Sequence, residues 1–206
     1  FAQSGCRSYL GVADGFAIEP SFGSTATVVR EKIGGLRGER LQTRDRLPCA
    51  TVSTRKHYYL PHIDQPRYQN TLTVRVIPGY QQRHFSREAQ RRFFRSTYRV
   101  SERCDRMGFR LEGETVHSDM VGMLSEGICH GAVQIPADGQ PIVLMNDRQT
   151  IGGYPKIGAV IPRDTASLSQ LSPGSRVRFE AISIEQAHNI HCLEQARFAN
   201  TSLQPC

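Results

Sequence analysis

Short apolar runs divided by turn residues are the feature of this 206-residue sequence that most constrains its fold. In residues 71–77, Leu72, Val74 and Val76 alternate with polar or charged residues, and a Pro-Gly pair follows. This period of two is typical of a strand with one buried face. Similar short runs predict further strands at residues 7–12, 26–30, 98–100, 109–111, 133–135, 142–144, 157–161 and 176–182.

Few segments carry helix signals. Side chains that can cap a helix N-terminus predict three helix starts, at Ser86, at Asp164 and at a capping box of Ser183 and Gln186. We expect the first helix to end near Arg95 and the last near Phe198, with a loose tail after Ala199. Many short strands with few helices predict a mainly β fold, in which a barrel or sandwich carries helices at its ends.

The composition supports a folded core, because 38% of the residues are hydrophobic and 9 Phe and 7 Tyr are available to fill it. No apolar run approaches the roughly 20 residues of a membrane span, so we expect no membrane association. Residues 1–5 have no Met, basic leader or apolar stretch. We therefore expect a truncated or processed chain without a signal peptide.

Cysteine and histidine usage favours a reducing compartment and no metal. The 6 cysteines are scattered and form no Cys-x-x-Cys motif, so we interpret them as reduced thiols in a cytoplasmic protein. His188 and His191 share a predicted helix face, but no carboxylate or second ligand pair has matching spacing. We therefore expect no bound metal.

The net charge of +7 raises the question of a nucleic-acid partner. Arginines cluster in residues 83–99 with Phe93 and Phe94 among them, an interleaving that can mark nucleic-acid binding. The alternative is an amphipathic helix with a solvated arginine face and both Phe residues in the core. We favour this alternative, because no nucleic-acid motif accompanies the cluster.

Three polar connections between predicted strands stand out as candidate binding loops, at residues 125–127, 136–141 and 146–156. Asp138 and Gly139 are explained by the needs of a turn. A turn does not require Gln140, whose amide is therefore a candidate ligand contact. Ser125, in the first loop, is a binding candidate, although its spacing to the flanking glycines is not that of a nucleophile elbow.

The third loop concentrates several kinds of polar group in Asp147, Arg148, Gln149 and Thr150. Arg148 offers a planar fork for a carboxylate, and Gln149 offers a donor and an acceptor for an amide or lactam edge. The alternative is a solvated turn whose charges face water. We favour a site, because a pocket needs such a density of distinct chemistries.

Flanking residues extend this candidate site. Gly152 and Gly153 allow a tight turn whose amides can face an anion, and the charge of Lys156 can complete the site. Upstream, we expect Asp105 and Arg106 to pair across a turn, with Arg106 as a further candidate for substrate binding.

Long collinear stretches of the chain resemble a known family. The stretches include Gln-Ile-Pro-Ala-Asp-Gly-Gln-Pro at 134–141, Asp-Arg-Gln-Thr at 147–150, Gly-Gly-Tyr-Pro-Lys at 152–156 and Asp-Arg-Met-Gly-Phe-Arg at 105–110. They resemble the KipA-like proteins, a family that includes the C subunit of 5-oxoprolinase and is also called allophanate hydrolase subunit 2 or the biotin-dependent carboxyltransferase family. Departures include His130, Asn146 and Ile151, where the family usually has proline, alanine and threonine.

The resemblance implies a cyclophilin-like β-barrel over residues 70–206, preceded in residues 1–69 by a linker and the remainder of a truncated N-terminal β domain. A typical member has about another hundred residues before position 1. Members work with a KipI-like subunit and with a LamB/YcsF-like subunit, and together they open 5-oxoproline to glutamate with ATP hydrolysis. Related domains of urea carboxylase transfer a carboxyl group from carboxybiotin to urea.

These implications lead to an enzyme-subunit hypothesis. Arg148 would hold a substrate carboxylate, while Gln149 and Gln140 would read an amide or ureido edge. We expect no cofactor on this chain, because ATP would bind a partner subunit or biotin would arrive on another domain. The cleft would be completed by the KipI-like partner, so the chain alone is expected to be inactive.

The proposed chemistry uses three further residues. Lys156 and Tyr154 would stabilise negative charge that develops on an oxygen. Glu126 would transfer a proton, provided that partial burial raises its pKa. The alternative function is a non-catalytic regulatory protein that binds and antagonises a KipI-like kinase inhibitor.

Overall fold

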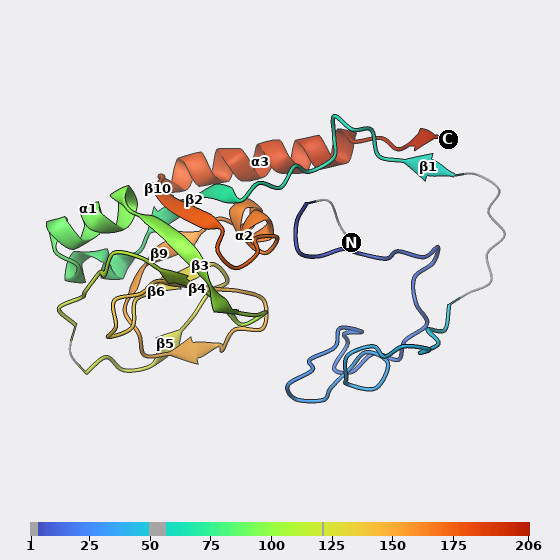
Figure 1. Cartoon of the computed structure of the whole chain (residues 1–206), viewed down its shortest axis with the longest axis horizontal. Coiled ribbons are helices and arrows are strands. Elements are labelled where there is room, and N and C mark those ends of the chain that lie inside the picture. The colour runs from blue at the N-terminus through green and yellow to red at the C-terminus, as the bar shows by residue number, and fades with distance from the viewer. Residues whose placement is uncertain (1–3, 50–56, 121) are drawn as a thin grey trace. The chain divides into compact units, whose positions relative to one another are not determined.

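The computed structural model describes residues 4–49, 57–120 and 122–206, which divide into two compact units (Figure 1). One unit contains the described residues up to Ser8 together with His62–Ser202. The other contains the described residues of Tyr9–Pro61 together with Leu203–Cys206. The predicted domain boundary between residues 69 and 70 stays a prediction.

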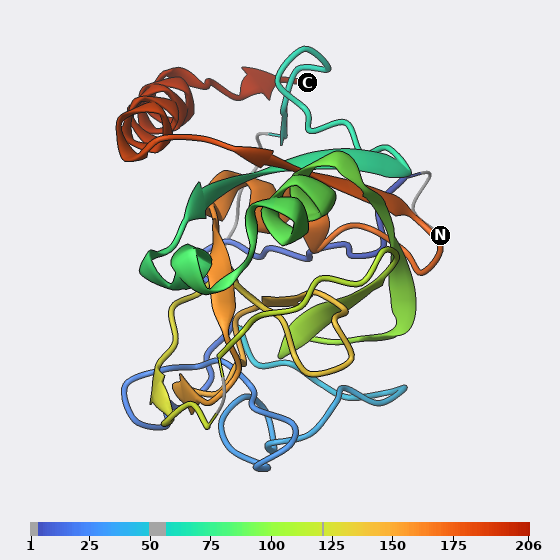
Figure 2. The same ribbon diagram turned by 90° about the vertical axis from the view of Figure 1, so that its left-hand side faces the viewer.

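A closed β-barrel forms the centre of the larger unit (Figures 1 and 2). Its strands are β2 (Thr71–Pro78), β3 (Thr97–Cys104), β4 (Gly108–Glu112), β6 (Ala132–Gln134), β7 (Ile142–Leu144), β9 (Lys156–Val160) and β10 (Arg176–Ala181). They follow one another around the barrel in the order β10-β2-β9-β6-β7-β4-β3. The β10–β2 pair is parallel and the other neighbouring pairs are antiparallel. The expected mainly β barrel is confirmed.

The barrel core is built from the inward faces of these strands and from one face of α1 (Arg87–Arg95). Figure 2 shows α1 in front of the barrel strands. Phe93 of this helix is fully buried, and its ring stacks on Phe179 of β10 with ring centroids 4.3 Å apart. Ser86 caps the helix by accepting a hydrogen bond from the Ala89 amide at 3.1 Å. The arginine-rich segment is therefore the expected amphipathic helix.

Strands β6 and β7 are buried on both faces. Val133 and Val143 point into the barrel core, whereas Ala132, Ile142 and Leu144 join a second apolar cluster on the opposite face. This cluster also contains Ile128, which follows β5 (Glu126–Gly127). Strand β5 pairs with β8 (Ile151–Gly152) in a separate two-stranded sheet. The outer face of β6 and β7 is thus largely buried.

Helix α2 (Pro162–Leu168) starts earlier than the sequence suggests. Its N-cap is Ile161, and Pro162 occupies the first turn, where a missing amide donor does no harm. The prediction of Asp164 as the cap is therefore wrong. The Asp164 carboxylate instead accepts hydrogen bonds from the backbone amide of Arg75 at 2.7 Å and from its guanidinium at 2.6 and 2.8 Å. This ion pair joins α2 to β2.

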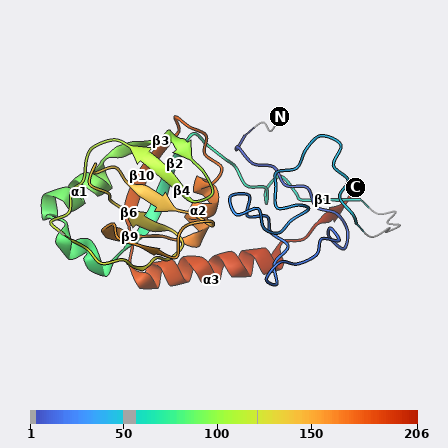
Figure 3. The ribbon, with the colours of Figure 1, turned by 90° about the horizontal axis from the view of Figure 1, so that it is seen from below.

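Helix α3 (Ile184–Asn200) follows β10 and appears as one straight helix in Figure 3. Both hydrogen bonds of the predicted capping box at Ser183 are present. The tail is not loose as expected, because β11 (Gln204–Pro205) pairs with β1 (Tyr58–Tyr59). Among the described residues, no helix combines the length and apolar character that a membrane crossing requires.

The strands predicted at residues 7–12 and 26–30 do not form. In residues 4–49 the structure contains isolated bridges, such as Phe16 with Cys49 and Val28 with Ile33, in place of ladders. Turns with positive φ at Asp14 and Lys32 interrupt the chain before a second strand can pair with either segment. Part of the segment expected to contain the linker, residues 51–56, lies outside the described residues.

Removal of the α1 anchor should destabilise the barrel strongly. Phe93→Ala leaves a cavity against Phe179, so we expect the free energy of unfolding to fall by about 3–5 kcal/mol in urea denaturation. Phe198→Ala is the control, because this ring is 83% exposed and its loss should change stability by at most about 0.5 kcal/mol. Equal effects of the two substitutions would contradict the assigned core.

Candidate functional site

A buried ammonium lies at the start of β9. Lys156 is 9% exposed, and its Nζ donates to a carboxylate oxygen of Glu126 and to the Gly127 carbonyl oxygen at 3.3 Å. A charge withdrawn from water in this way needs a counter-charge and hydrogen-bond acceptors. The ion pair therefore fixes β5 against the barrel wall.

Glu126 accepts hydrogen bonds from three side chains, namely Lys156, Gln81 through Nε2 at 2.6 Å, and the Tyr80 hydroxyl. The Lys156 hydrogen bond, followed by that of Tyr80, lowers the pKa of Glu126 below its ordinary value. The expectation that burial raises this pKa is wrong, because the donors outweigh desolvation. The hydrogen bond to Glu126 in turn raises the pKa of the Tyr80 phenol.

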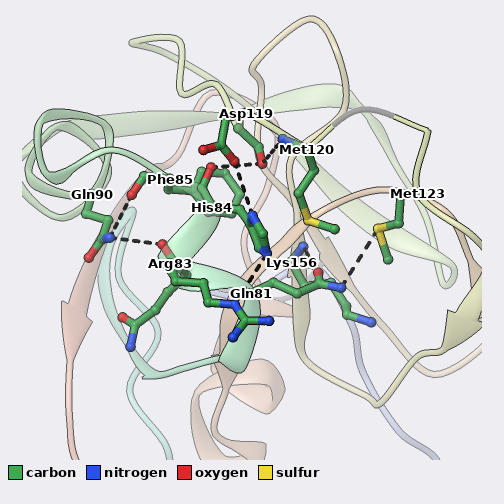
Figure 4. Close-up of polar contacts among 11 residues, drawn as sticks. Gln81, Arg83, His84, Phe85, Gln90, Asp119, Met120, Met123 and Lys156 are labelled. Carbon is green, nitrogen blue, oxygen red and sulfur yellow. Dashed lines mark hydrogen bonds and ion pairs between the residues drawn. The ribbon is translucent and has the colours of Figure 1, made fainter.

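Gln81 joins this ion pair to the barrel. It lies on the 3-10 helix η1 (Tyr80–His84), is 4% exposed, and accepts the backbone N–H of Lys156 through Oε1 at 2.8 Å. Figure 4 shows Gln81 between this amide and Met123, whose Sδ lies 3.8 Å from Nε2. One carboxamide thus orients both the main chain of Lys156 and the carboxylate of Glu126.

The η1 segment is itself held by its neighbours (Figure 4). Gln90 of α1 donates through Nε2 to the carbonyl oxygens of Gln82 at 2.9 Å and Phe85 at 2.8 Å. On the other side, the His84 carbonyl oxygen accepts the Asp119 amide at 2.9 Å. These contacts keep Tyr80 and Gln81 in place without a ligand.

A pocket of about 560 Å³ opens beside β4, β6 and β7. Its apolar lining comes from Ile128, Ile142 and Leu144 of the second apolar cluster. Gln134 and Tyr154 also line it. A volume of this size and a partly apolar lining are typical of sites for small molecules.

The rim of the pocket is basic. Three arginines line it, Arg103, Arg110 and Arg148, against two acidic residues, Glu102 and Asp105. The half-buried Arg148 donates to the carbonyl oxygens of residues 128 and 145 at 3.3 and 3.4 Å, and within the described part of the chain it has no carboxylate partner. An anionic group of a ligand can therefore pair with this guanidinium.

The predicted site residues fall into two adjoining groups. Arg148, Gln149 and Tyr154 line the pocket, whereas Glu126 and Lys156 form the ion pair. The two groups meet at Gly152, the register partner of Glu126. A Cβ on this glycine would lie 3.0 Å from Gln134 Nε2 in the pocket wall.

Gln140 does not take part in the pocket. Its Oε1 accepts the Gly113 amide at 2.8 Å, and its Nε2 donates to the Gly113 carbonyl oxygen at 3.1 Å. The prediction of a ligand contact is wrong, because both ends of the carboxamide tie two loops together. The expected convergence of Gln140 with Arg148 and Lys156 therefore does not occur.

Asp105 and Arg106 do not pair with each other as predicted. Asp105 accepts the backbone amides of Met107 at 2.8 Å and Gly108 at 3.1 Å, which makes it a turn residue. Arg106 instead forms a two-pronged ion pair with Asp147 at 2.6 and 2.9 Å. This pair links the two loops beside the pocket, and substrate binding by Arg106 and Asp147 stays a prediction.

The other predicted binding residues lie on the exposed β5–β8 connections. The Thr150 carbonyl oxygen accepts the Ile128 amide at 2.9 Å, which supports the β5–β8 pair through the main chain. Ser125 and Gly153 are exposed neighbours, since a Cβ on Gly153 would lie 3.5 Å from Ser125 Oγ. Ligand contacts by these residues stay predictions.

Three residues of the site were missed in the sequence, Tyr80, Gln81 and Gln134. The signal for Gln134 was present, because a carboxamide interrupts the apolar run from Ala132 to Ile135. Tyr80 and Gln81 gave no comparable signal. Gln81 reaches Lys156 across 75 positions of the chain.

Residues 4–49, 57–120 and 122–206 contain no group of three His, Cys, Asp or Glu side chains placed to hold a metal ion. The chemistry available at the site is instead a carboxylate held ionised, an ammonium, a phenol and a guanidinium beside an apolar pocket. The guanidinium and the pocket lining can bind a small anionic molecule with a polar carbonyl group.

The barrel and the pocket beside it define a mainly β domain with a candidate site for a small molecule. The sequence profile of the carboxyltransferase domain, subdomain A and B, matches residues 1–181. The chain therefore belongs to the carboxyltransferase domain family, and the resemblance stated from the sequence is confirmed.

Similar proteins include two bacterial enzyme subunits. The chain is 40% identical over 186 residues to the C subunit of 5-oxoprolinase from Escherichia coli (strain K12), in a match that covers 90% of the chain. It is 37% identical over 187 residues to the C subunit of 5-oxoprolinase from Haemophilus influenzae, again over 90% of the chain. The chain spans 59% of the length of each of these relatives.

A solved structure supports the fold. The crystal structure of the K. lactis urea amidolyase superposes with a TM-score of 0.83 at 21% identity, covering 96% of this chain and 13% of that one. At this identity the likeness concerns the barrel architecture alone.

Loss of the ammonium should change the titration of Glu126. Lys156→Met removes the largest cause of its lowered pKa, so we expect this pKa to rise toward the ordinary value of 4.5 in a carboxyl NMR titration. In the parent protein, the stabilisation from the lowered pKa is complete above the ordinary value and is lost as the pH falls through the folded-state pKa. The variant should show a smaller loss of stability over this acidic window.

Arg148→Met is the matched control, because its guanidinium hydrogen-bonds carbonyl oxygens of residues 128 and 145 rather than Glu126. It should leave the pKa of Glu126 unchanged. The same pKa in the Lys156→Met variant as in the parent protein would contradict the assigned ion pair.

Proposed function

We propose that this chain is the C subunit of an ATP-dependent 5-oxoprolinase, or the corresponding part of a related carboxyltransferase, that acts on a small amide, lactam or ureido substrate. The 40% identity to the C subunit of the E. coli 5-oxoprolinase, over 90% of the chain, carries the proposal. The family match and the H. influenzae relative agree with it.

The pocket and the ion pair suggest how substrate is held. Arg148, at the basic rim, pairs with the substrate carboxylate, and Gln149 contacts the amide edge. Tyr154 lies at the same pocket and is 51% exposed, so its hydroxyl can approach an oxygen that gains negative charge.

Glu126 takes a different role from the one expected in the sequence. Its lowered pKa keeps it ionised at neutral pH, so it acts as the counter-charge of Lys156 rather than as an acid. Lys156, which donates to Glu126, supplies the compensating positive charge beside the reacting group.

The proposal implies partners that complete the enzyme. A KipI-like subunit covers the cleft, and a LamB/YcsF-like subunit joins the complex in the cytoplasm. ATP binds to a partner subunit, or biotin is delivered by another domain in the carboxyltransferase case. The chain alone is then inactive.

No observation favours the alternative of a regulatory protein that antagonises a KipI-like inhibitor. Both 5-oxoprolinase relatives carry the name of an enzyme component. Copurification with a KipI-like protein alone, without turnover of any substrate, would reverse this preference.

Arg148→Ala should reduce turnover of 5-oxoproline by the complex, copurified with its partner subunits and supplied with ATP, by at least about 100-fold. The lost guanidinium leaves the substrate carboxylate unpaired. Arg87→Ala is the control, because this exposed arginine on α1 does not line the pocket. Turnover of the Arg148 variant at the parent rate, with folding intact, would remove Arg148 from the site.

A complex that turns over urea with carboxybiotin, and leaves 5-oxoproline unchanged, would assign the carboxyltransferase branch of the proposal. A complex active on neither substrate would contradict the proposed function.

A further inference from the structure

A buried donor without a partner faces the ligand pocket. Gln134, on β6, is 5% exposed and lines the pocket. Its Nε2 is fully buried and has no hydrogen-bond partner among the residues that the structure describes. Buried amide groups are normally hydrogen-bonded, so each exception needs a reason.

The surroundings of Gln134 do not explain a carboxamide by packing. Its side chain shares the outer face of the barrel wall with Ala132 and Ile142, and Ile128 lies within the same apolar cluster. An apolar side chain of the same length would fill this position without an unpaired donor.

The backbone at Gly152 packs closely against this amide. Gly152 lacks the positive φ that favours glycine, so its backbone conformation would accept a larger residue. A Cβ at this position would lie 3.0 Å from Gln134 Nε2 and 2.5 Å from Ile128 Cδ1. Close packing against Gln134 and Ile128, rather than backbone conformation, therefore favours glycine at this position.

The positive charge at the pocket favours an anionic ligand. The guanidinium of Arg148 lines the same pocket and has no carboxylate partner within the described residues. A ligand with a carbonyl group at one end and an anionic group at the other can satisfy both side chains. The pocket volume of about 560 Å³ admits a five-membered ring with such substituents.

We propose that Gln134 is a specificity-determining residue, whose Nε2 donates a hydrogen bond to the ring carbonyl oxygen of a lactam or cyclic urea while Arg148 pairs with the anionic group. This inference deepens the proposed function and rests on it, because it assigns the reading of the substrate carbonyl. A site built around a hydrogen bond rejects ligands that lack the matching group, since the buried donor is then left unpaired.

Two probes isolate the carbonyl contact. 5-Oxoproline carries the lactam and a carboxylate, whereas cyclopentanecarboxylate has a similar ring and carboxylate without the lactam. Titration of the isolated chain, followed by calorimetry or NMR shifts, should give at least about tenfold tighter binding of 5-oxoproline. Gln134→Met should abolish this preference by weakening 5-oxoproline binding at least about tenfold, and should leave cyclopentanecarboxylate binding unchanged.

The midpoint of thermal unfolding distinguishes a ligand-binding role of Gln134 from a structural role. Gln134→Met removes an unpaired buried donor and keeps the side-chain length, so its midpoint should equal or exceed that of the parent chain. Gly152→Ala is the second variant, because its methyl group would lie 3.0 Å from Nε2 and displace the carboxamide. It should also reduce the preference for 5-oxoproline.

Arg148→Met distinguishes the Gln134 assignment from the proposed function. It should weaken the binding of both probes to a similar degree, because both carry a carboxylate. Suppose that Gln134→Met keeps the full preference for 5-oxoproline over cyclopentanecarboxylate, while Arg148→Met weakens the binding of both. The assignment of Gln134 is then overturned, and the proposed site at Arg148 stands. If the parent chain binds neither probe, or binds both equally, the assignment of Gln134 is also overturned. The proposed function is then decided separately by turnover of the copurified complex.

Discussion

The buried ammonium of Lys156 is the constraint on which the site depends. A charge at 9% exposure is tolerated because Glu126 supplies the counter-charge and the Gly127 carbonyl oxygen accepts a further hydrogen bond. Gln81 satisfies the main chain of the same residue and donates to the same carboxylate. One ion pair thereby fixes strand β9, strand β5 and helix η1, which are far apart in the sequence.

The pocket follows from a barrel wall that is buried on both sides. Val133 and Val143 fill the core, so the alternate positions, Gln134 and Ile142, face outward and form the pocket floor. The register of β6 with β9 shifts between Val133 and Gln134. Because side chains alternate with a period of two, this register decides which side chains reach the pocket.

Much of the barrel could be predicted from the sequence, because its strands show local signals. The alternation of apolar and polar residues in 71–77 predicted β2. The capping box at Ser183 predicted the start of α3. The apolar runs at 7–12 and 26–30 looked similar but formed no strand. A strand needs a partner ladder, and the sequence of one segment does not say whether a partner is available.

The site was predictable only in part, for a related reason. Arg148, Gln149 and Tyr154 were found because they crowd into one loop, and the structure places them at one pocket. The prediction for Gln140 was wrong, because its carboxamide hydrogen-bonds to Gly113. The sequence alone does not distinguish such a structural carboxamide from one that binds a ligand. The charged state of Glu126 depends on donors from distant segments, which no local pattern reports.

We infer that the pocket and the ion pair form one site for a small anionic carbonyl compound. A crystal structure of the chain soaked with 5-oxoproline tests it most directly. We expect the carboxylate to lie at the guanidinium of Arg148 and the ring carbonyl oxygen within hydrogen-bond distance of Gln134 Nε2. An empty pocket at saturating 5-oxoproline, or a molecule bound only elsewhere on the chain, would contradict it.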